Sequence, residues 1–315
     1  MDCDNVPDLL RKIKDNIDKV IIGKEHVEDM VLAALICGGH VLIEDVPGLG
    51  KTTFVSALAR SLNLSFKRIQ FTPDVLPTDV TGFTSFNLKT GEREVNFGGV
   101  MAQIVLADEI NRTSPKTQSS LLEVMQEGQV TIDGVSYPVP LPFIVLATQN
   151  PVEHVGTYPL PEAQLDRFLM KISMGYPKMN EEIDILKRHK GVNLLDSLTP
   201  VATADDIMRL RSIHRKITCA QPIMEYIVAI SKATRRHTKI SLGISPRGSL
   251  ALMNAAMANA MLCGRNYTIP DDVQAMAMPV LAHRLAISFQ RSERTETPEA
   301  ILDEILKSVQ VPGVS

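Results

Sequence analysis

The chain has 315 residues, which is enough for one large domain or two moderate ones, each with a hydrophobic core. Hydrophobic residues make up 44% and charged residues 22%, as in an ordinary globular protein. The 33 Lys and Arg against 36 Asp and Glu give a formal net charge of −3. This balance excludes a strongly basic nucleic-acid-binding protein, although it leaves a local basic stripe open.

The cysteines and the N-terminal segment exclude further classes. The four cysteines lie far apart and form no C-x-x-C pair, so the sequence predicts neither a zinc site nor a disulfide framework. Scattered free thiols are typical of a reducing compartment. The N-terminal segment carries charges throughout, unlike a signal peptide. The best apolar run, residues 30–37, is much shorter than the roughly 20 residues of a membrane helix. We therefore expect a cytoplasmic protein without a membrane span.

Between residues 40 and 175, short apolar strands alternate with helical segments. The first strand, "HVLIE" (40–44), leads through a glycine-rich loop into a helix (52–63) with Val55, Leu58 and Leu62 on one face. The further strands expected are 65–71, 103–108, 142–148 and 168–174. Such alternation predicts an α/β fold with a five-stranded, mainly parallel sheet covered by helices on both faces. Ligands of such sheets bind beyond the carboxyl ends of the strands, where the glycine-rich loop lies.

The loop "EDVPGLGKTT" (44–53) nearly matches the phosphate-binding pattern G-x-x-x-x-G-K-[ST], but Asp45 replaces the first glycine. Gly48 and Gly50 let the backbone N–H groups turn toward phosphates, and the following helix adds its N-terminal dipole. Lys51 would bridge the β- and γ-phosphates, and Thr52 would be a ligand of Mg²⁺. The other nucleotide-binding residues expected in this loop are Pro47, Leu49 and Thr53. The strand before the loop and the helix after it favour this interpretation over a chance glycine turn.

Two stretches interrupt the alternation with patterns typical of β-hairpins. Residues 84–97 contain Thr90-Gly91 between alternating arms, and residues 128–139 contain Asp133-Gly134, which favours a type I′ turn. Each stretch precedes a strand of the sheet. We therefore expect both hairpins to project from the same region.

Two strands end in polar residues suited to hydrolysis. "IVLADE" (104–109) ends in Asp108, which would hold the Mg²⁺ shell, and Glu109, which would orient and polarise the attacking water. "LATQNP" (146–151) contains Asn150, which would hold that water against Glu109. Taken alone, the first could equally be a solvated strand end, and the second would be interpreted as a polar strand-to-loop exit. Their place in one α/β segment with the glycine-rich loop favours a catalytic interpretation.

After Pro177 the chain is expected to be helical, without strands. Helical periodicity covers residues 180–190, 204–217, 222–235, 246–263, 270–288 and 298–309. We therefore divide the chain into an α/β nucleotide-binding domain (1–176) and a helical lid domain (177–315). Met253, Met257 and Met261 lie four residues apart, and we interpret them as packing residues of a helix rather than as a partner groove.

The order of the motifs resembles the MoxR family of AAA+ ATPases, from about residue 20 to residue 310. The segments are "EDVPGLGKTT", "RIQFTPDVLPTDVTG", "VLADEINR", "LLEVMQEGQVTIDG", "VLATQNP", "YPLPEAQLDRF" and "ISPRGS". The family accepts aspartate at the position of Asp45, outside the turn that would wrap the phosphates. We therefore expect Asp45 to point away from the nucleotide, and Asp45→Gly to alter ATP turnover little.

The resemblance implies further site residues. Gly23 matches the adenine-side motif, with Ile22 packing near the base. Arg167 in "QLDRF" matches the arginine finger, a cation offered to the γ-phosphate of a neighbouring subunit. The alternative is a surface arginine that begins a strand. Arg247 in "SPRGS" matches the second sensor, which would reach the phosphates of its own subunit from the lid. Arg112 faces either a neighbour or solvent.

The family also implies an activity and partners. ATP would be the substrate and Mg²⁺ the cofactor. A site that needs Arg167 from a neighbour is complete only at a heterologous interface, and such interfaces close into rings. We therefore expect a homo-oligomeric ring, with six subunits as the expected number. The ring would remodel or mature client proteins in a chaperone-like way, with proteins containing von Willebrand factor A-type domains as the implied client class. The hairpins match the inserts of the helix-2-insert branch, which includes magnesium chelatase and MCM ATPases.

Three other functions stay open on the sequence. A nucleic-acid remodeller of the same branch is disfavoured by the charge balance and by the shortage of aromatic residues, with no Trp and five Tyr. A magnesium-chelatase-like motor subunit would be distinguished by a porphyrin-pathway partner that raises turnover. A non-enzymatic scaffold that uses ATP as a switch is disfavoured by Glu109 and Arg167.

Overall fold

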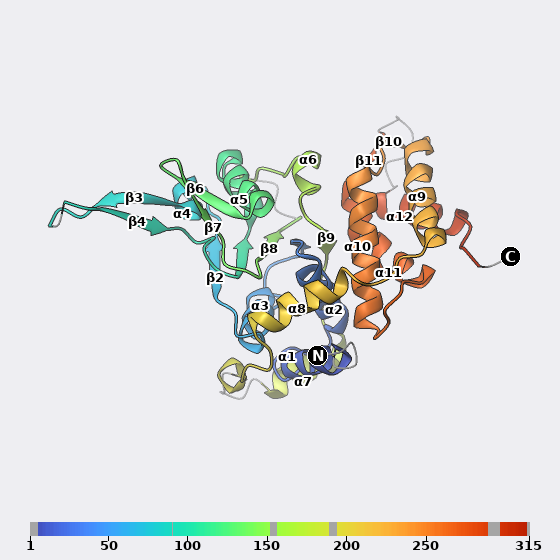
Figure 1. Cartoon of the computed structure of the whole chain (residues 1–315), viewed down its shortest axis with the longest axis horizontal. Helices are drawn as coiled ribbons and strands as arrows, with labels where there is room; N and C mark the ends of the chain where they lie inside the picture. Colours follow the sequence, from blue (N-terminus) through green and yellow to red (C-terminus); the bar gives the residue numbers. More distant parts are fainter. Residues whose placement is uncertain (1–5, 90, 152–155, 189–193, 289–296, 314–315) are drawn as a thin grey trace.

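The computed structural model describes residues 6–89, 91–151, 156–188, 194–288 and 297–313 (Figure 1). Its centre is a five-stranded sheet in the order β2-β5-β8-β1-β9. The strands are β1 (Val41–Glu44), β2 (Phe66–Gln70), β5 (Ile104–Asp108), β8 (Ile144–Gln149) and β9 (Met170–Ile172). All four pairings within this sheet are parallel, which confirms the predicted α/β fold.

The register aligns the polar carboxyl ends of the strands. Glu44 is opposite Gln149, and Gln70 is opposite Asp108. The central strands β5 and β8 are buried on both faces until their last residue, in keeping with their nearly continuous apolar sequences. The polar residues therefore gather at one edge of a rigid, buried sheet.

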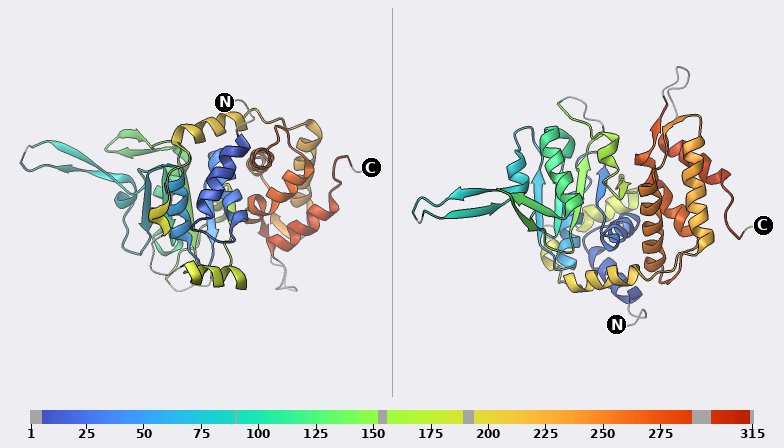
Figure 2. Two further views of the ribbon diagram at one scale, coloured as in Figure 1. Left: turned by 90° about the horizontal axis from the view of Figure 1, so that it is seen from below. Right: turned by 45° about the horizontal axis from the view of Figure 1, so that its top comes forward.

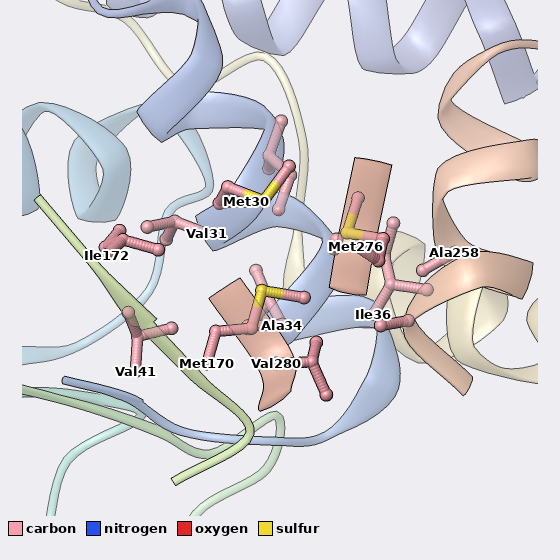
Figure 3. Packing of buried hydrophobic residues seen from close by; sticks show 14 of the residues in the cluster. Met30, Val31, Ala34, Ile36, Val41, Met170, Ile172, Ala258, Met276 and Val280 are labelled. Carbon is pink, nitrogen blue, oxygen red and sulfur yellow. The ribbon is translucent and has the colours of Figure 1, made fainter. Parts of the chain in front are cut away.

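Helices cover both faces of the sheet. One face packs against α1 (Val6–Ile17), α2 (Glu25–Cys37) and α3 (Lys51–Ser61). The strands contribute Ile43, Leu106 and Leu146 to the apolar cluster on this face. The other face packs against α5 (Pro115–Glu127) and α4 (Pro77–Thr81). Figure 3 shows α2 between the sheet and the C-terminal helices, with Met30 and Val31 close to Ile172.

Both predicted hairpins are present as insertions. β3 (Gly82–Phe86) pairs antiparallel with β4 (Arg93–Phe97), and β6 (Gln129–Ile132) pairs antiparallel with β7 (Val135–Pro138). β3 and β6 are in contact, so the two hairpins leave the same end of the molecule, as expected. The β3–β4 hairpin extends far from the sheet, opposite the C-terminal helices (Figures 1 and 2). Its predicted turn includes Thr90, which lies outside the described residues.

The C-terminal half is mainly helical, as predicted. Its helices are α6 (Glu162–Leu165), α7 (Met179–Arg188), α8 (Ala204–His214), α9 (Gln221–Arg236), α10 (Pro246–Leu262), α11 (Pro270–Leu281) and α12 (Pro298–Ser308), with the short 3₁₀ turns η3 (Leu194–Ser197) and η4 (Ala282–Arg284). A further 3₁₀ turn, η2 (Ile110–Arg112), joins β5 to α5 in the N-terminal half. Met257 and Met261 are buried in the core and Met253 packs against it, so these methionines are packing residues. Residues 189–190, the predicted end of the helix at 180–190, lie outside the described residues.

The prediction of no strands after residue 177 is wrong. β10 (Ile240–Leu242) pairs antiparallel with β11 (Ala286–Ile287). β11 lies inside the segment 270–288, which was predicted to be one helix. The helix ends early at Leu281, and the buried Arg284 guanidinium donates to the backbone oxygens of Phe168, Leu169 and Val280. These tertiary bonds outweigh the local helical preference.

The division at residue 176 stays a prediction. Residues 173–178 connect β9 to α7, but one apolar cluster includes side chains of α2, α10 and α11 together. None of the helices in the described ranges is long and apolar enough to cross a membrane. The cytoplasmic location stays a prediction.

Candidate nucleotide-binding site

The glycine-rich loop joins the end of β1 to the start of α3. Gly48 and Gly50 have φ angles of 90° and 82°, which favour glycine. A Cβ atom at either position would meet no described atom within 4 Å, so the space beside the loop is open. The Lys51 ammonium donates to the Asp45 backbone oxygen at 2.9 Å. Burial lowers the pKa of Lys51, and the nearby carboxylates of Asp45, Asp108 and Glu109 oppose this shift.

A cavity of about 310 Å³ lies between this loop and the carboxyl ends of β2, β5 and β8. Its lining includes the predicted residues Pro47, Gly48, Gly50, Lys51, Thr52, Thr53, Asp108, Glu109 and Asn150. Groups that are up to about 100 positions apart in the sequence therefore face one space. We call it the phosphate cavity. The individual roles assigned to these residues stay predictions.

Two of the three acidic residues that line the phosphate cavity, Asp108 and Glu109, are held by a hydroxyl group, and the third is Asp45. Thr148 Oγ1 donates to Asp108 Oδ1 at 2.6 Å and accepts from the Glu109 backbone N–H at 2.9 Å. Glu109 has a φ angle of 58°, in the left-handed region that is unfavourable for a residue with a side chain. Such backbone strain is concentrated at functional sites.

Two further residues of the phosphate cavity, Arg68 and Gln70 on β2, were not predicted from the sequence. The Arg68 guanidinium binds Asp108 Oδ2 through Nη2 at 2.6 Å and through Nε at 3.1 Å. Arg68 also donates to Gln70 Oε1 at 2.5 Å, and Gln70 Nε2 donates to Glu109 Oε2 at 2.8 Å. The period of two along "FKRIQ" (66–70) places both side chains on one face of the strand, which is the pattern that could have identified them.

Arg112 lies beside the predicted water-orienting residue. Its guanidinium donates to Glu109 Oε2 at 3.1 Å, the same oxygen that accepts from Gln70. Within the chain, Arg112 therefore pairs with Glu109. The sequence left its direction open.

A second, mainly apolar cavity of about 680 Å³ adjoins the phosphate cavity, since Gly48, Gly50 and Thr53 line both. Its walls include Ile22 and Leu49, two of the residues predicted to bind the nucleotide. We call it the base cavity. Its size and apolar lining suit a purine base.

Gly23 lies at the entrance of α2 and has a φ angle of 67°. A Cβ atom there would lie 2.3 Å from the Cδ atom of Glu181 on α7. Gly23 therefore lets α7 approach the segment that forms the base cavity.

Arg167 does not line the phosphate cavity. It borders a separate polar cavity of about 530 Å³ together with residues of α5, among them Glu123 and Glu127. No described carboxylate lies within ion-pair distance of its guanidinium, although two acidic residues share its cavity. This position suits an arginine offered to another subunit.

The structure does not bring Arg247 to the phosphate cavity of its own chain, which was the expected place. Ser245 caps α10, and Pro246 begins it, so Arg247 lies in the first turn of this helix. Its Nε atom lies 3.8 Å from Asp166 Oδ2, and Asp166 also binds the buried Arg284 at 2.7 Å. The ion pairs of Asp166 therefore hold the start of α10 beside Arg167.

The residues present fit Mg²⁺. Asp108 and Thr52 supply a carboxylate and a hydroxyl oxygen to the phosphate cavity, and Mg²⁺ prefers such ligands, with water and phosphate oxygens completing its shell. The described residues contain no group of three or more His, Cys, Asp or Glu side chains that could hold a metal by themselves. Any Mg²⁺ here would depend on the nucleotide for part of its shell.

Comparisons with known proteins agree with this geometry. The family model for the "ATPase family associated with various cellular activities (AAA)" matches residues 40–170, and the AAA lid domain model matches residues 232–305. An uncharacterised Bacillus subtilis protein, YeaC, is 52% identical over 96% of this chain and 95% of its own. The chaperone MoxR1 of Mycobacterium tuberculosis is 41% identical over 95% of this chain and 81% of its own.

A solved structure is similar over the same length. The crystal structure of an ATPase candidate from Cytophaga hutchinsonii superposes with a TM-score of 0.92 at 37% identity, and covers 98% of this chain and 96% of that one. The parallel sheet, the glycine-rich loop and the matched lid define an AAA+ ATPase. Since the similarity to MoxR1 extends over nearly the whole chain, the chain belongs to the MoxR family of AAA+ ATPases.

Proposed function

We propose that this chain hydrolyses ATP in a homo-oligomeric ring, and that the ring uses this reaction to remodel or mature client proteins. The observation that carries the proposal is the phosphate cavity, in which Lys51, Asp108, Glu109 and Asn150 face one space. Phosphoryl transfer requires positioning and charge stabilisation, and these residues supply a cation, carboxylates and an amide for that purpose. The adjoining base cavity accepts the rest of the nucleotide.

In the proposed reaction, Lys51 exchanges its bond to the Asp45 backbone oxygen for the terminal phosphates. Glu109 orients the attacking water and accepts its proton, assisted by Asn150. Mg²⁺, held by Thr52 and Asp108, would neutralise the charge that develops on the phosphate oxygens. Glu109 must first be released from Arg112 or Gln70, because both donate to one of its oxygens.

Arg167 and Arg247 are proposed to complete the site of a neighbouring subunit. Arg167 follows Asp166 in sequence, and Arg247 at the start of α10 lies 3.8 Å from Asp166, whereas neither arginine lines the phosphate cavity of its own chain. A contact between two different surfaces closes into a ring when its rotation allows, and six subunits are the proposed number. The assembly then provides the cations that one chain lacks.

The β3–β4 hairpin is proposed as a contact for the client protein. Phe86, Val95 and Phe97 share one face of this two-stranded ribbon, and Phe86 is 62% exposed. An isolated ribbon of two strands does not bury such residues, and exposed apolar side chains of this kind mark interaction sites. Proteins with von Willebrand factor A-type domains are the proposed client class.

The activity is tested by measuring phosphate release and nucleotide affinity for the purified chain and two variants. Lys51→Ala is expected to lose ATP binding, because it removes the cation of the loop. Glu109→Gln is expected to bind ATP and to release phosphate at least about 100-fold more slowly, because it removes the general base. Unchanged turnover in both variants would refute the proposed site.

The role in remodelling is tested with the stalled Glu109→Gln ring and ATP as bait. A client should be retained by Glu109→Gln and lost when Phe86→Ser is added to the same chain. Leu250→Ser, which changes an equally exposed leucine of α10 (57%), is the matched control and should retain the client. Retention by both double variants would exclude the hairpin as the contact.

A further inference from the structure

Asp45 stands where the common phosphate-binding pattern has its first glycine, and its side chain is buried. The carboxylate accepts hydrogen bonds from Ser173 Oγ at 2.7 Å, from the Met174 N–H at 2.5 Å and from the Gly175 N–H at 3.3 Å. Charge-assisted bonds of this kind are stronger than neutral ones. The aspartate is therefore bound to the segment that follows β9, which we call the strap (residues 173–175).

The strap is held from its other side by a cation. The Lys24 ammonium donates to the backbone oxygens of Met174 and Gly175, at 2.7 and 3.0 Å. The N–H groups of these two residues thus face a carboxylate, while their C=O groups face an ammonium. This arrangement fixes the backbone of the strap, in addition to the packing of the buried Met174 side chain in the apolar core.

The strap is also a wall of the base cavity. Met174 and Lys24 line that cavity, and Pro177 and Ile185 continue the wall toward and along α7. At the same time the backbone oxygen of Asp45 accepts from Lys51, the cation of the phosphate cavity. Asp45 thus contacts Lys51 through its backbone, and through its side chain it contacts the strap that forms a wall of the base cavity.

We propose that Asp45 is a positioning residue that holds the base cavity in shape, so that the site prefers a complete nucleotide to a bare phosphate chain. The inference rests on the proposed ATP site and deepens it. It also changes the expectation that Asp45→Gly alters turnover little, because glycine can make none of the three side-chain bonds. In this protein the aspartate is needed where other phosphate-binding loops have glycine.

The test compares the dissociation constants of ATP and of inorganic tripolyphosphate, each with Mg²⁺, measured by calorimetry on the full chain. Tripolyphosphate fills the phosphate cavity alone, whereas ATP needs both cavities. In Asp45→Asn, an NH2 donor replaces one of the two carboxylate oxygens, so the amide cannot satisfy donors at both positions. We expect ATP to bind about tenfold more weakly. Tripolyphosphate should bind equally well or more tightly, because a negative charge near Lys51 is removed.

Two other variants keep the test valid if Asp45→Asn does not fold. Lys24→Met removes the cation on the opposite side of the strap and should also weaken ATP more than tripolyphosphate. Ser173→Ala removes one bond of the three and should give the same change to a smaller degree. Glu44→Gln is the matched control, since this neighbouring carboxylate binds Gln149 and Lys171 instead of the strap, and both affinities should stay unchanged.

The outcomes separate this inference from the proposed function. A wild-type chain that binds neither ATP nor tripolyphosphate would overturn the ATP site itself, whereas a wild-type chain that binds both equally would overturn the preference proposed here. If the wild-type chain prefers ATP but Asp45→Asn and Lys24→Met weaken both ligands equally, or neither, the positioning role of Asp45 is wrong. Selective loss of ATP affinity in these variants, with melting temperatures close to the wild type, supports it.

Discussion

Arg68 connects the two acidic residues of the site through Gln70. Its guanidinium binds Asp108, and its bond to Gln70 continues to Glu109, so one hydrogen-bonded chain links the proposed metal ligand to the proposed water-orienting residue. The side chain of Arg68 is 46% exposed, whereas that of Asp108 is 16% exposed. This arginine supplies Asp108 with positive charge that a bound Mg²⁺ would also supply.

Because Arg68 and Mg²⁺ would compete for the same carboxylate, Arg68→Met should lower the Mg²⁺ concentration that gives half-maximal ATP turnover. We expect a decrease of about threefold or more, since a bond of this kind at a partly exposed site contributes about 1 kcal/mol. The measurement is a Mg²⁺ titration of phosphate release. Lys67→Met is the control, because Lys67 is adjacent in sequence but donates to the Gly98 backbone oxygen. A higher or unchanged Mg²⁺ requirement in Arg68→Met would rule out the competition.

At the scale of single residues, the sequence allowed candidate site residues to be predicted where they are consecutive in the chain. The loop from Pro47 to Thr53 and the pair Asp108 and Glu109 are contiguous, and their positions follow from one strand end each. Arg68 and Gln70 could not be assigned, because their importance comes from a neighbouring strand almost 40 residues away. The ion pair of Arg247 with Asp166 could not be predicted for the same reason, since it depends on how α10 docks, and the role of Arg247 as second sensor stays a prediction.

The elements of the sheet were predictable because their sequences are apolar and bounded by turn residues. The order of the strands in the sheet was not predictable, since it depends on which helices cross the sheet. Helices α1 and α2 were not predicted, although α1 has Val6, Leu10, Ile13 and Ile17 along one buried face. α2 is apolar on nearly all sides because it lies between the sheet and the C-terminal helices, so it lacks an amphipathic pattern.

Glu28 is a buried acidic residue on α2 that faces the end of α1. Burial, and next the carboxylate of Asp18, raise the pKa of Glu28 to about 8. The fold therefore keeps the proton of Glu28 up to about pH 8, whereas the unfolded chain releases it near the ordinary value of 4.5. The contribution of this group to stability is full below about pH 4.5 and is lost as the pH rises toward 8.

Glu28→Gln should make the fold more stable at pH 8 than the wild type, because glutamine resembles the protonated acid at every pH. The difference in melting temperature should be roughly 2 °C or more at pH 8 and should shrink toward pH 5, where both side chains are neutral in the fold. Thermal unfolding followed by circular dichroism across this range is the measurement. Glu25→Gln changes an exposed residue of the same helix and should show no such trend. A pH-independent difference would contradict the assigned titration.

At the scale of the whole molecule, the two halves of the proposed reaction lie on different surfaces. The phosphate cavity opens beside α3, whereas Arg167 lies against α5 and Arg247 lies at the start of α10. The sequence predicted the class of fold, and its motifs predicted which residues the phosphate cavity and the arginine-bearing surface would contain. It could not predict how the C-terminal helices sit on α2 and β9, because that arrangement depends on packing between residues from about 100 to more than 200 positions apart.

The separation of these surfaces predicts that two inactive variants can restore one another. Arg167→Ala keeps an intact phosphate cavity but lacks the cation for its neighbour, whereas Lys51→Ala lacks the cavity's cation but keeps Arg167. In a ring mixed at random in equal amounts, about a quarter of the interfaces pair an intact cavity with an intact Arg167. Phosphate release should therefore recover to about a quarter of the wild-type rate, from a loss of about 10³-fold or more in Arg167→Ala alone.

The matched control replaces Lys51→Ala by the double variant Lys51→Ala with Arg167→Ala. Mixed with Arg167→Ala, this double variant creates no interface that holds both an intact cavity and an Arg167 side chain, so turnover should stay at the level of Arg167→Ala. Recovery in the first mixture alone means that the arginine acts across subunits, because no single chain in that mixture is complete. Equal rates in the two mixtures, measured at several ratios, would mean that Arg167 acts within its own chain and that each subunit works independently of its neighbours.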